Sequence, residues 1–242
     1  MKKRLITLMV AGVMVFSLAA CSAQGNTGTD VSAEESSGNS AEAAELETIT
    51  ITSLNGNGEE IELEVPYKPE KVAILDMPSL DIIDSLGEGE RVVGSADTSL
   101  DYLQDYVTSE EVAKLGTIKE ADMEAVMECE PEVIFIGGRL ASVYDDLSKI
   151  APVVYLSTDI EKGVVQSVRE NAETIASIFG KQEEVESLME GFDARIEKLA
   201  SFAADKTAII GLCTSGGFNI LGNDGRCSMI GNEIGFENVG VD

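Results

Sequence analysis

The alternation of short apolar runs with amphipathic stretches constrains the fold of this protein more than any other feature of its sequence. Three runs, Val72–Leu75, Val133–Ile136 and Val153–Leu156, consist of aliphatic and aromatic side chains. Such runs are typical of strands that are buried on both faces of a parallel sheet. Helical patterns lie between and after them, at residues 80–86, 121–128, 141–150 and 163–179. The alternation predicts an α/β fold with a mainly parallel sheet and helices on both of its faces.

A β-hairpin is expected to precede this sheet. Thr48–Leu54 alternates apolar and polar residues, and the alternation resumes at Ile61–Val65. Asn55–Gly58 lies between the two stretches and supplies turn residues that tolerate positive φ. Pro66 and Pro69 then end the second strand.

A long helix is expected after the sheet. Gln182–Ala204 carries apolar residues at three- and four-residue spacing, and such a helix is about 34 Å long at roughly 1.5 Å per residue. A helix of this length can connect two lobes. The remaining sequence predicts strands at Ala208–Leu212 and Phe218–Leu221 and a short helix at Ser228–Ile234.

The N-terminus is typical of an export signal. Three basic residues precede the apolar stretch Leu5–Ala20, which is short for a membrane span. The stretch ends in Leu18-Ala-Ala-Cys21, which resembles the lipobox of bacterial lipoproteins. That resemblance implies cleavage before Cys21 and attachment of lipid to its thiol. An ordinary signal peptide followed by a cysteine is the alternative.

Composition then divides the sequence into segments. Residues 22–46 are rich in serine, glycine and acidic residues and lack basic ones, so they predict a flexible tether. The expected organisation is a signal peptide at 1–20, an acidic tether at 21–46, an N-terminal α/β lobe at 47–165, connecting helices at 166–205 and a partial C-terminal lobe at 206–242.

Charge and residue counts exclude several classes of function. The protein has 17 Lys and Arg residues against 44 Asp and Glu residues, and the net charge of −27 argues against nucleic-acid binding. It has no histidine, so the commonest ligand of zinc and haem and the usual general base of hydrolases are absent from it. No nucleophile and base can be paired, and we expect neither an enzyme nor a resident cofactor or metal. Cys129, Cys213 and Cys227 lack metal-ligand spacing and are expected to be free thiols, with a Cys213–Cys227 disulfide as the alternative.

Two arginines are candidates for binding an anion. Arg139 follows Gly137-Gly138 at the carboxyl end of a buried strand, where open α/β sheets bind ligands. Arg226 lies in a loop between a strand and a helix N-terminus. The alternative for each is a solvated loop residue. Met77 and Thr98 follow the first and second strands, so both are expected at the same crevice.

Several segments together resemble the iron-siderophore substrate-binding lipoproteins of ABC importers, in the Fe/B12 class. The segments Val72–Gly87, Arg91–Gly94 and Asp122–Gly137 are similar to that family's opening strands and helices. Gly138-Arg139 and Ser148–Tyr155 are most similar to its catecholate binders. The resemblance implies a two-lobed class III substrate-binding protein with a long connecting helix. Only Lys206–Asp242 corresponds to the second lobe, so that lobe is expected to be incomplete and the protein to be truncated at its C-terminal end.

The resemblance also implies a function. The protein would capture a ferric catecholate siderophore through Arg139 and Arg226 and deliver it to the permease of an ABC importer. Glu124 resembles a glutamate with which this class docks the permease, and a solvated helix charge is the alternative. The implied form is a monomer, lipid-anchored at the cell membrane on the extracellular or periplasmic side. A corrinoid or haem binder of the same class and a surface-anchored adhesion or scaffold module are the competing hypotheses, and an enzyme comes third.

Overall fold

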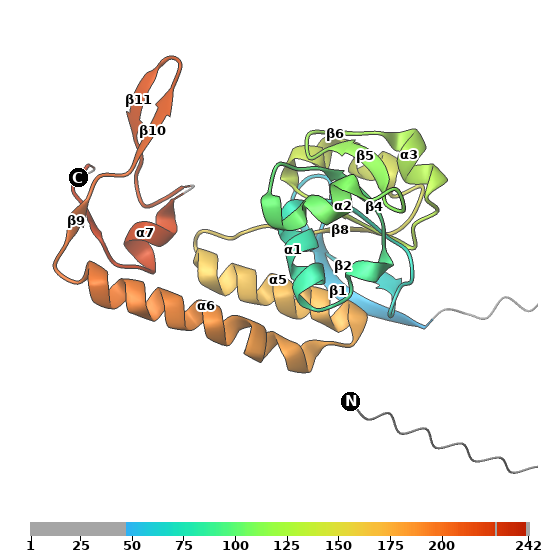
Figure 1. Cartoon of the computed structure of the whole chain (residues 1–242), viewed down its shortest axis with the longest axis horizontal. Helices are drawn as coiled ribbons and strands as arrows, with labels where there is room; N and C mark the ends of the chain where they lie inside the picture. The colour runs from blue at the N-terminus through green and yellow to red at the C-terminus, as the bar shows by residue number, and fades with distance from the viewer. Residues whose placement is uncertain (1–46, 226, 241–242) are drawn as a thin grey trace, which may run out of the picture. The chain divides into compact units, whose positions relative to one another are not determined.

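A computed structural model describes residues 47–225 and 227–240, and its centre is a six-stranded sheet (Figure 1). The strand order is β6-β5-β4-β3-β7-β8, and every neighbouring pair is parallel except β5 and β6. The predicted α/β class is therefore confirmed. The strands are β3 (Val72–Leu75), β4 (Val92–Asp97), β5 (Ala113–Thr117), β6 (Glu120–Ala121), β7 (Val133–Ile136) and β8 (Val153–Tyr155).

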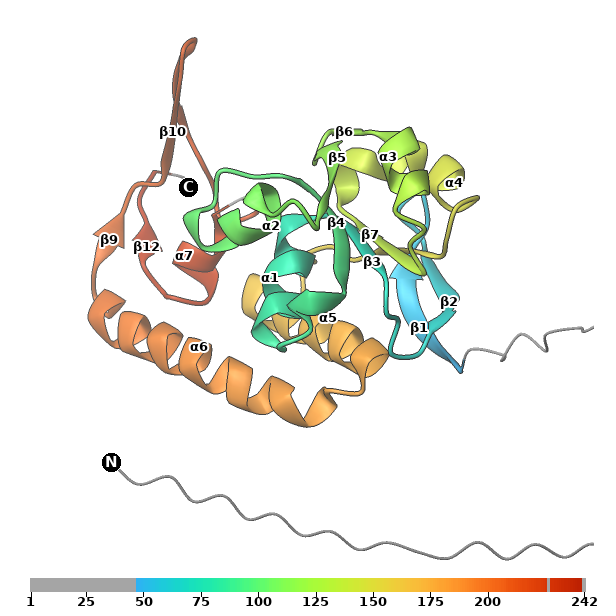
Figure 2. The same cartoon turned by 45° about the vertical axis from the view of Figure 1, so that its right-hand side comes forward.

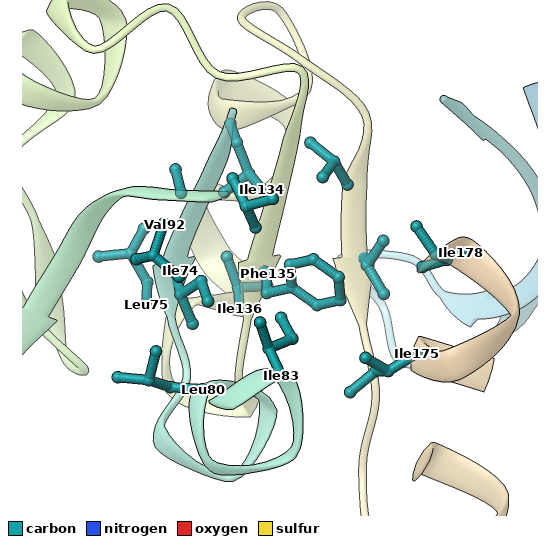
Figure 3. Close-up of a cluster of buried hydrophobic side chains, with 14 of the residues drawn as sticks. Ile74, Leu75, Leu80, Ile83, Val92, Ile134, Phe135, Ile136, Ile175 and Ile178 are labelled. Atoms are coloured by element: carbon teal, nitrogen blue, oxygen red, sulfur yellow. The ribbon is translucent and has the colours of Figure 1, made fainter. Parts of the chain in front are cut away.

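Helices cover both faces of the sheet. Every residue of β3 and β7 is buried, and since successive side chains point to opposite faces, both faces must be covered. Figure 3 shows the ring of Phe135 between the sheet and side chains that include Ile83 and Ile175. The helices of this part are α1 (Met77–Ser85), α2 (Gln104–Thr108), α3 (Met123–Glu128), α4 (Tyr144–Leu147) and α5 (Val164–Phe179), with 3-10 turns η1 (Gly89–Arg91), η2 (Asp101–Leu103) and η3 (Gly138–Val143).

The first helix begins earlier than its apolar pattern indicates. Asp76 is the N-cap of α1, and its carboxylate accepts hydrogen bonds from the backbone N–H and the hydroxyl of Ser79, at 3.1 and 2.8 Å. Pro78 lies in the first turn, where its missing N–H costs nothing. The cap therefore fixes the helix start at Met77, directly after β3, rather than at Leu80.

The N-terminal hairpin forms a separate two-stranded sheet of β1 (Thr48–Leu54) and β2 (Glu60–Pro66), as predicted. It is attached to β8 by one buried hydroxyl. The Ser53 Oγ accepts a hydrogen bond from the Tyr155 N–H at 2.9 Å and lies 3.3 Å from the Tyr155 carbonyl oxygen, to which it donates. The hairpin is therefore held beside the strand that ends at the candidate site.

The long helix predicted at residues 182–204 is confirmed as α6 (Gln182–Ala203). It packs against α5, and the two helices lie side by side in Figures 1 and 2. Gly180 ends α5 in the left-handed conformation, and Arg169 on α5 forms an ion pair with Asp193 on α6.

The segment after α6 departs from the expected strand at Ala208–Leu212. Thr207 and Ala208 pair in parallel with one strand, whereas Gly211–Thr214 pairs antiparallel with another, so the apolar run is divided between two sheets. The Glu233 carboxylate, just after the last helix, accepts hydrogen bonds from the Val164 and Val165 N–H groups and so caps α5. These elements are β9 (Thr207–Ala208), β10 (Gly211–Thr214), β11 (Gly217–Ile220), α7 (Ser228–Asn232) and β12 (Glu237–Asn238).

Three sequence-based predictions lie outside the described residues. They are the signal peptide at 1–20, the tether at 21–46 with its lipidated Cys21, and the site residue Arg226. Within the described ranges no helix has both the length and the hydropathy needed to cross a membrane. Cys129, Cys213 and Cys227 are free thiols.

Candidate functional site

The candidate site is a cleft at the carboxyl edge of the parallel sheet. After β3 the backbone leads to β4 on one side, and it later returns to β7 on the other side of β3. The β3–β7 boundary is therefore a topological switch point, the place where open α/β sheets bind ligands. A cleft of about 250 Å³ lies there, and its wall includes Asp76, Ser79, Gly137, Gly138, Tyr155 and Asn171.

Two adjacent glycines give this cleft its shape. A Cβ atom on Gly137 would lie 2.5 Å from the Asp76 Oδ1, and one on Gly138 would lie 2.8 Å from the Tyr155 hydroxyl oxygen. Both distances are shorter than van der Waals contact, so any larger residue would push these polar groups away. The glycine pair therefore allows a carboxylate and a phenol to come close to the backbone that follows β7.

Burial determines the electrostatics of Asp76. Removal from water raises the pKa of its carboxyl group, and the hydrogen bonds from the Ser79 hydroxyl and N–H oppose that rise. The Asp76 Oδ2 accepts both of those hydrogen bonds. The carboxylate is thus fixed in orientation by the start of α1 while it contributes to the wall of the cleft.

A larger hollow of about 670 Å³ shares part of this wall. It lies between the β1–β2 hairpin and α5, and it has Tyr155, Leu156, Ser157 and Asn171 in common with the cleft. Its Lys162 Nζ lies 3.1 Å from the Glu170 Oε2. A hydrogen bond from Gln166 and this contact with Lys162 lower the pKa of Glu170. The cation is therefore paired within the hollow.

The structure places three of the predicted ligand-binding residues at the same edge of the sheet. Met77, Thr98 and Arg139 follow the carboxyl ends of β3, β4 and β7, which are adjacent and parallel. Arg139 is exposed at the start of η3 and forms no ion pair with any described residue. None of the three belongs to the wall of the 250 Å³ cleft.

The surroundings of these residues differ. Met77 is 8% exposed and packs in the hydrophobic core. Thr98 is half-buried, and its Oγ1 accepts a hydrogen bond from the Leu100 N–H at 3.2 Å. Glu124, the predicted docking residue, is exposed in the first turn of α3, which follows β6 after the N-cap residue Asp122.

Two polar residues of the cleft were missed by sequence reasoning. Asp76 directly follows a buried strand, and this position indicates a residue at the carboxyl edge of the sheet. It also precedes Met77-Pro78, and an aspartate just before a proline is a signal for a helix N-cap. The sequence pattern indicates Tyr155 only as part of an apolar strand. Its position beside Gly138 depends on the pairing of β7 with β8, which the local sequence does not reveal.

Two proteins of known ligand are similar to this chain in sequence. The chain is 31% identical over 230 residues to the petrobactin-binding protein YclQ of Bacillus subtilis, an alignment that covers 95% of this chain and 65% of YclQ. It is 24% identical over 177 residues to the ferric-anguibactin-binding protein FatB of Vibrio anguillarum, covering 71% of this chain and 54% of FatB. The chain thus spans less than two thirds of the length of either relative.

Solved structures show the same fold. The crystal structure of YclQ superposes with a TM-score of 0.73 at 29% identity and covers 79% of this chain and 67% of its own. The periplasmic catecholate-siderophore binding protein VctP from Vibrio cholerae gives a TM-score of 0.69 at 26% identity, over 78% of this chain and 67% of its own. The mixed α/β fold matches that of class III periplasmic binding proteins, as predicted. The family model described as "Periplasmic binding protein" matches residues 72–240, and the chain therefore belongs to this family.

Proposed function

We propose that the protein captures a ferric catecholate siderophore outside the cytoplasmic membrane and delivers it to the permease of an ABC importer. The observation that carries this proposal is the cleft at the β3–β7 switch point, which Gly137 and Gly138 shape and Arg139 follows. The names of its relatives YclQ and VctP, a petrobactin binder and a catecholate-siderophore binder, support the same class of ligand. The protein is neither an enzyme nor the carrier of a resident cofactor, and it acts as a monomer.

The chemistry of the ligand suits an exposed arginine. In a ferric tris-catecholate the ligand oxygens already fill the coordination of iron, and the complex carries negative charge. The protein then needs cations and hydrogen-bond donors rather than metal ligands. The planar guanidinium of Arg139 can donate hydrogen bonds to two oxygens at once. The net charge of −27 does not prevent capture, because salt screens distant charges over about 8 Å.

The location of the protein is a further part of the proposal. Leu18–Cys21 supports export and lipid anchoring through Cys21, with the domain displayed on the outer side of the membrane. Arg226 is proposed as the second ligand-binding arginine, because the sequence puts it in a loop before a helix. Met77 and Thr98 are proposed as neighbours of the bound complex, because β3 and β4 end at the edge of the sheet where the cleft lies.

Absorbance spectroscopy tests the proposed ligand class directly. The protein, expressed from its complete coding sequence, is incubated with ferric catecholate, cobalamin or haem and then separated from free ligand. If the separated protein shows the charge-transfer absorption band from catecholate to iron, it has bound the ferric catecholate, and this result supports the proposal. Retention of cobalamin or haem alone would instead identify a corrinoid or haem binder, and retention of none of the three would support an adhesion or scaffold role.

Replacing Arg139 with alanine is expected to weaken ferric catecholate binding by about 1.5 to 3 kcal/mol, the usual contribution of a hydrogen bond to a charged group. Quenching of tyrosine fluorescence measures the affinity, since the protein has five tyrosines and no tryptophan. Arg195→Ala is the matched control, because Arg195 is an exposed arginine on α6 that lines neither the cleft nor the larger hollow. Equal affinities for wild type and Arg139→Ala would refute the assignment of Arg139.

Reversing the charge of Glu124 is expected to reduce siderophore-dependent iron uptake while leaving the affinity for ligand unchanged. Glu124 is exposed on α3 and contributes to neither hollow. Uptake of radioactive iron by cells that carry Glu124→Lys measures transport, and fluorescence quenching of the purified variant measures binding. Glu128→Lys, at the other end of the same short helix, is the control. Normal uptake with Glu124→Lys would show that this residue does not dock the permease.

A further inference from the structure

The cleft at the β3–β7 boundary has an unexpected charge for a site that receives an anion. Asp76 is the one charged residue among the described residues that line it. Arg139 follows Gly138 in sequence but its side chain does not contribute to this wall. A catecholate oxygen seated in the cleft would therefore face a carboxylate with no cation of the wall to offset it.

One oxygen of Asp76 is available to a ligand. The Oδ2 accepts the two hydrogen bonds from Ser79, whereas the Oδ1 accepts none from any described residue. The Oδ1 lies beside Gly137, where an added Cβ would approach it to 2.5 Å. Gly137 and Asp76 both line the cleft, so this oxygen is an oriented acceptor at its wall.

The remaining polar groups around the cleft are neutral. The Tyr155 hydroxyl lies beside Gly138, and it forms no hydrogen bond within the described ranges. Asn171 donates to the Ser157 carbonyl oxygen at 3.2 Å, which leaves its own amide oxygen as an acceptor. The hydroxyl and amide groups of the wall can both donate and accept hydrogen bonds, so they do not select the charge of a ligand. The single formal charge among the described residues of the wall is that of Asp76, and it favours a cationic donor at the Oδ1 over an anion.

A cation would also relieve the cost of burying Asp76. Burial raises the pKa of this carboxyl group because the charged form loses water, and a positive charge at the Oδ1 would restore a favourable partner. A protonated amine supplies the positive charge, and its N–H groups can donate hydrogen bonds to a carboxylate oxygen.

We propose that Asp76 binds a protonated amine on the scaffold of the siderophore. The ligand would lie with its cationic arm in the cleft against the Asp76 Oδ1 and with its anionic ferric catecholate centre beyond Gly138, toward Arg139. The inference rests on the proposed function, and it adds that the preferred substrate carries both charges. Asp76 is then a specificity-determining residue that selects amine-bearing catecholates over purely anionic ones.

Two synthetic probes test this inference. They are the ferric complexes of two tris-catecholamides of equal size whose scaffolds differ at one position, a secondary amine in one and a methylene group in the other. Wild-type protein is expected to bind the amine probe about tenfold or more tightly than the methylene probe, because a charge-assisted hydrogen bond is gained. Tyrosine fluorescence quenching gives both dissociation constants.

The variant Asp76→Asn is expected to bring this preference close to unity. Asparagine caps helices as well as aspartate does, so the start of α1 and the fold are retained while the charge is removed. Asp81→Asn is the matched control, because it removes the same charge from an exposed position on the same helix that does not line the cleft. It should keep the wild-type preference.

The outcomes separate the inference from the function on which it rests. Equal affinity of wild type for the two probes, or a preference that persists in Asp76→Asn, overturns the role of Asp76 while capture of ferric catecholates stands. A wild-type protein that binds neither probe overturns the proposed function and this inference together.

Discussion

Replacement of Phe135 by alanine is expected to lower the free energy of unfolding by about 3 to 5 kcal/mol, the range for truncating a fully buried aromatic residue. Phe135 is 0% exposed and lies on β7, between β3 and β8. Its ring packs toward Ile83 on α1 and the α5 side chains on the same face of the sheet (Figure 3). The truncation removes contacts with two strands and two helices at once and leaves a cavity that they cannot all close.

Urea denaturation followed by circular dichroism measures this change. Phe218→Ala is the matched control, since Phe218 lies on the β10–β11 hairpin and is 60% exposed. The same truncation there should change the free energy of unfolding by no more than about 0.5 kcal/mol, as for surface substitutions in general. A loss below about 1 kcal/mol for Phe135→Ala would contradict the position of this side chain at the centre of the core.

The parts of the fold that sequence reasoning predicts well are those with both faces covered. Val72–Leu75 and Val133–Ile136 were expected as buried strands and are β3 and β7 with the same bounds. A strand between two helical layers needs apolar residues at every position, so its sequence is distinctive. Those two strands also define the switch point, and the edge at which Arg139 was expected follows from them.

A strand in which only some residues are buried is harder to predict, because its sequence is not uniformly apolar. The strand β5 (Ala113–Thr117) was not predicted, because Leu115 is the one fully buried residue in a segment that also contains lysine, glycine and threonine. It lies near the end of the sheet and its pairing with β4 gives it its structure. Tertiary pairing, rather than local pattern, determines such segments.

The interior of the cleft was the least predictable part of the site. The position of Arg139 after a strand follows from the order of elements in the sequence. The approach of Asp76 and Tyr155 to the glycine pair does not, because it joins the ends of three different strands. The sequence therefore indicates the edge of the sheet, but it does not reveal how closely Asp76 and Tyr155 approach the glycine pair there.

Replacement of Gly116 by alanine is the second substitution with a large expected effect, and it acts through the backbone. Gly116 has a φ of +91°, which costs a residue with a Cβ about 1 to 2 kcal/mol. The added Cβ would also lie 2.4 Å from the Glu120 carbonyl oxygen and 3.0 Å from the Asp122 N–H nitrogen. Relief of this overlap costs roughly a further 1 to 3 kcal/mol, so the total loss should be about 2 to 5 kcal/mol.

Displacement of Asp122 by the added Cβ would also move α3, the helix that carries the proposed docking residue Glu124. The Asp122 N–H donates to the Leu115 carbonyl oxygen at 2.9 Å, and the Asp122 side chain caps α3, which carries Glu124. Gly58→Ala is the matched control, because Gly58 has a φ of +78° with no atom within 4 Å of an added Cβ. It should lose only the conformational part, about 1 to 2 kcal/mol. Equal losses of unfolding free energy for the two variants in urea would mean that β6 moves aside freely, and Gly116 would then not fix the position of α3.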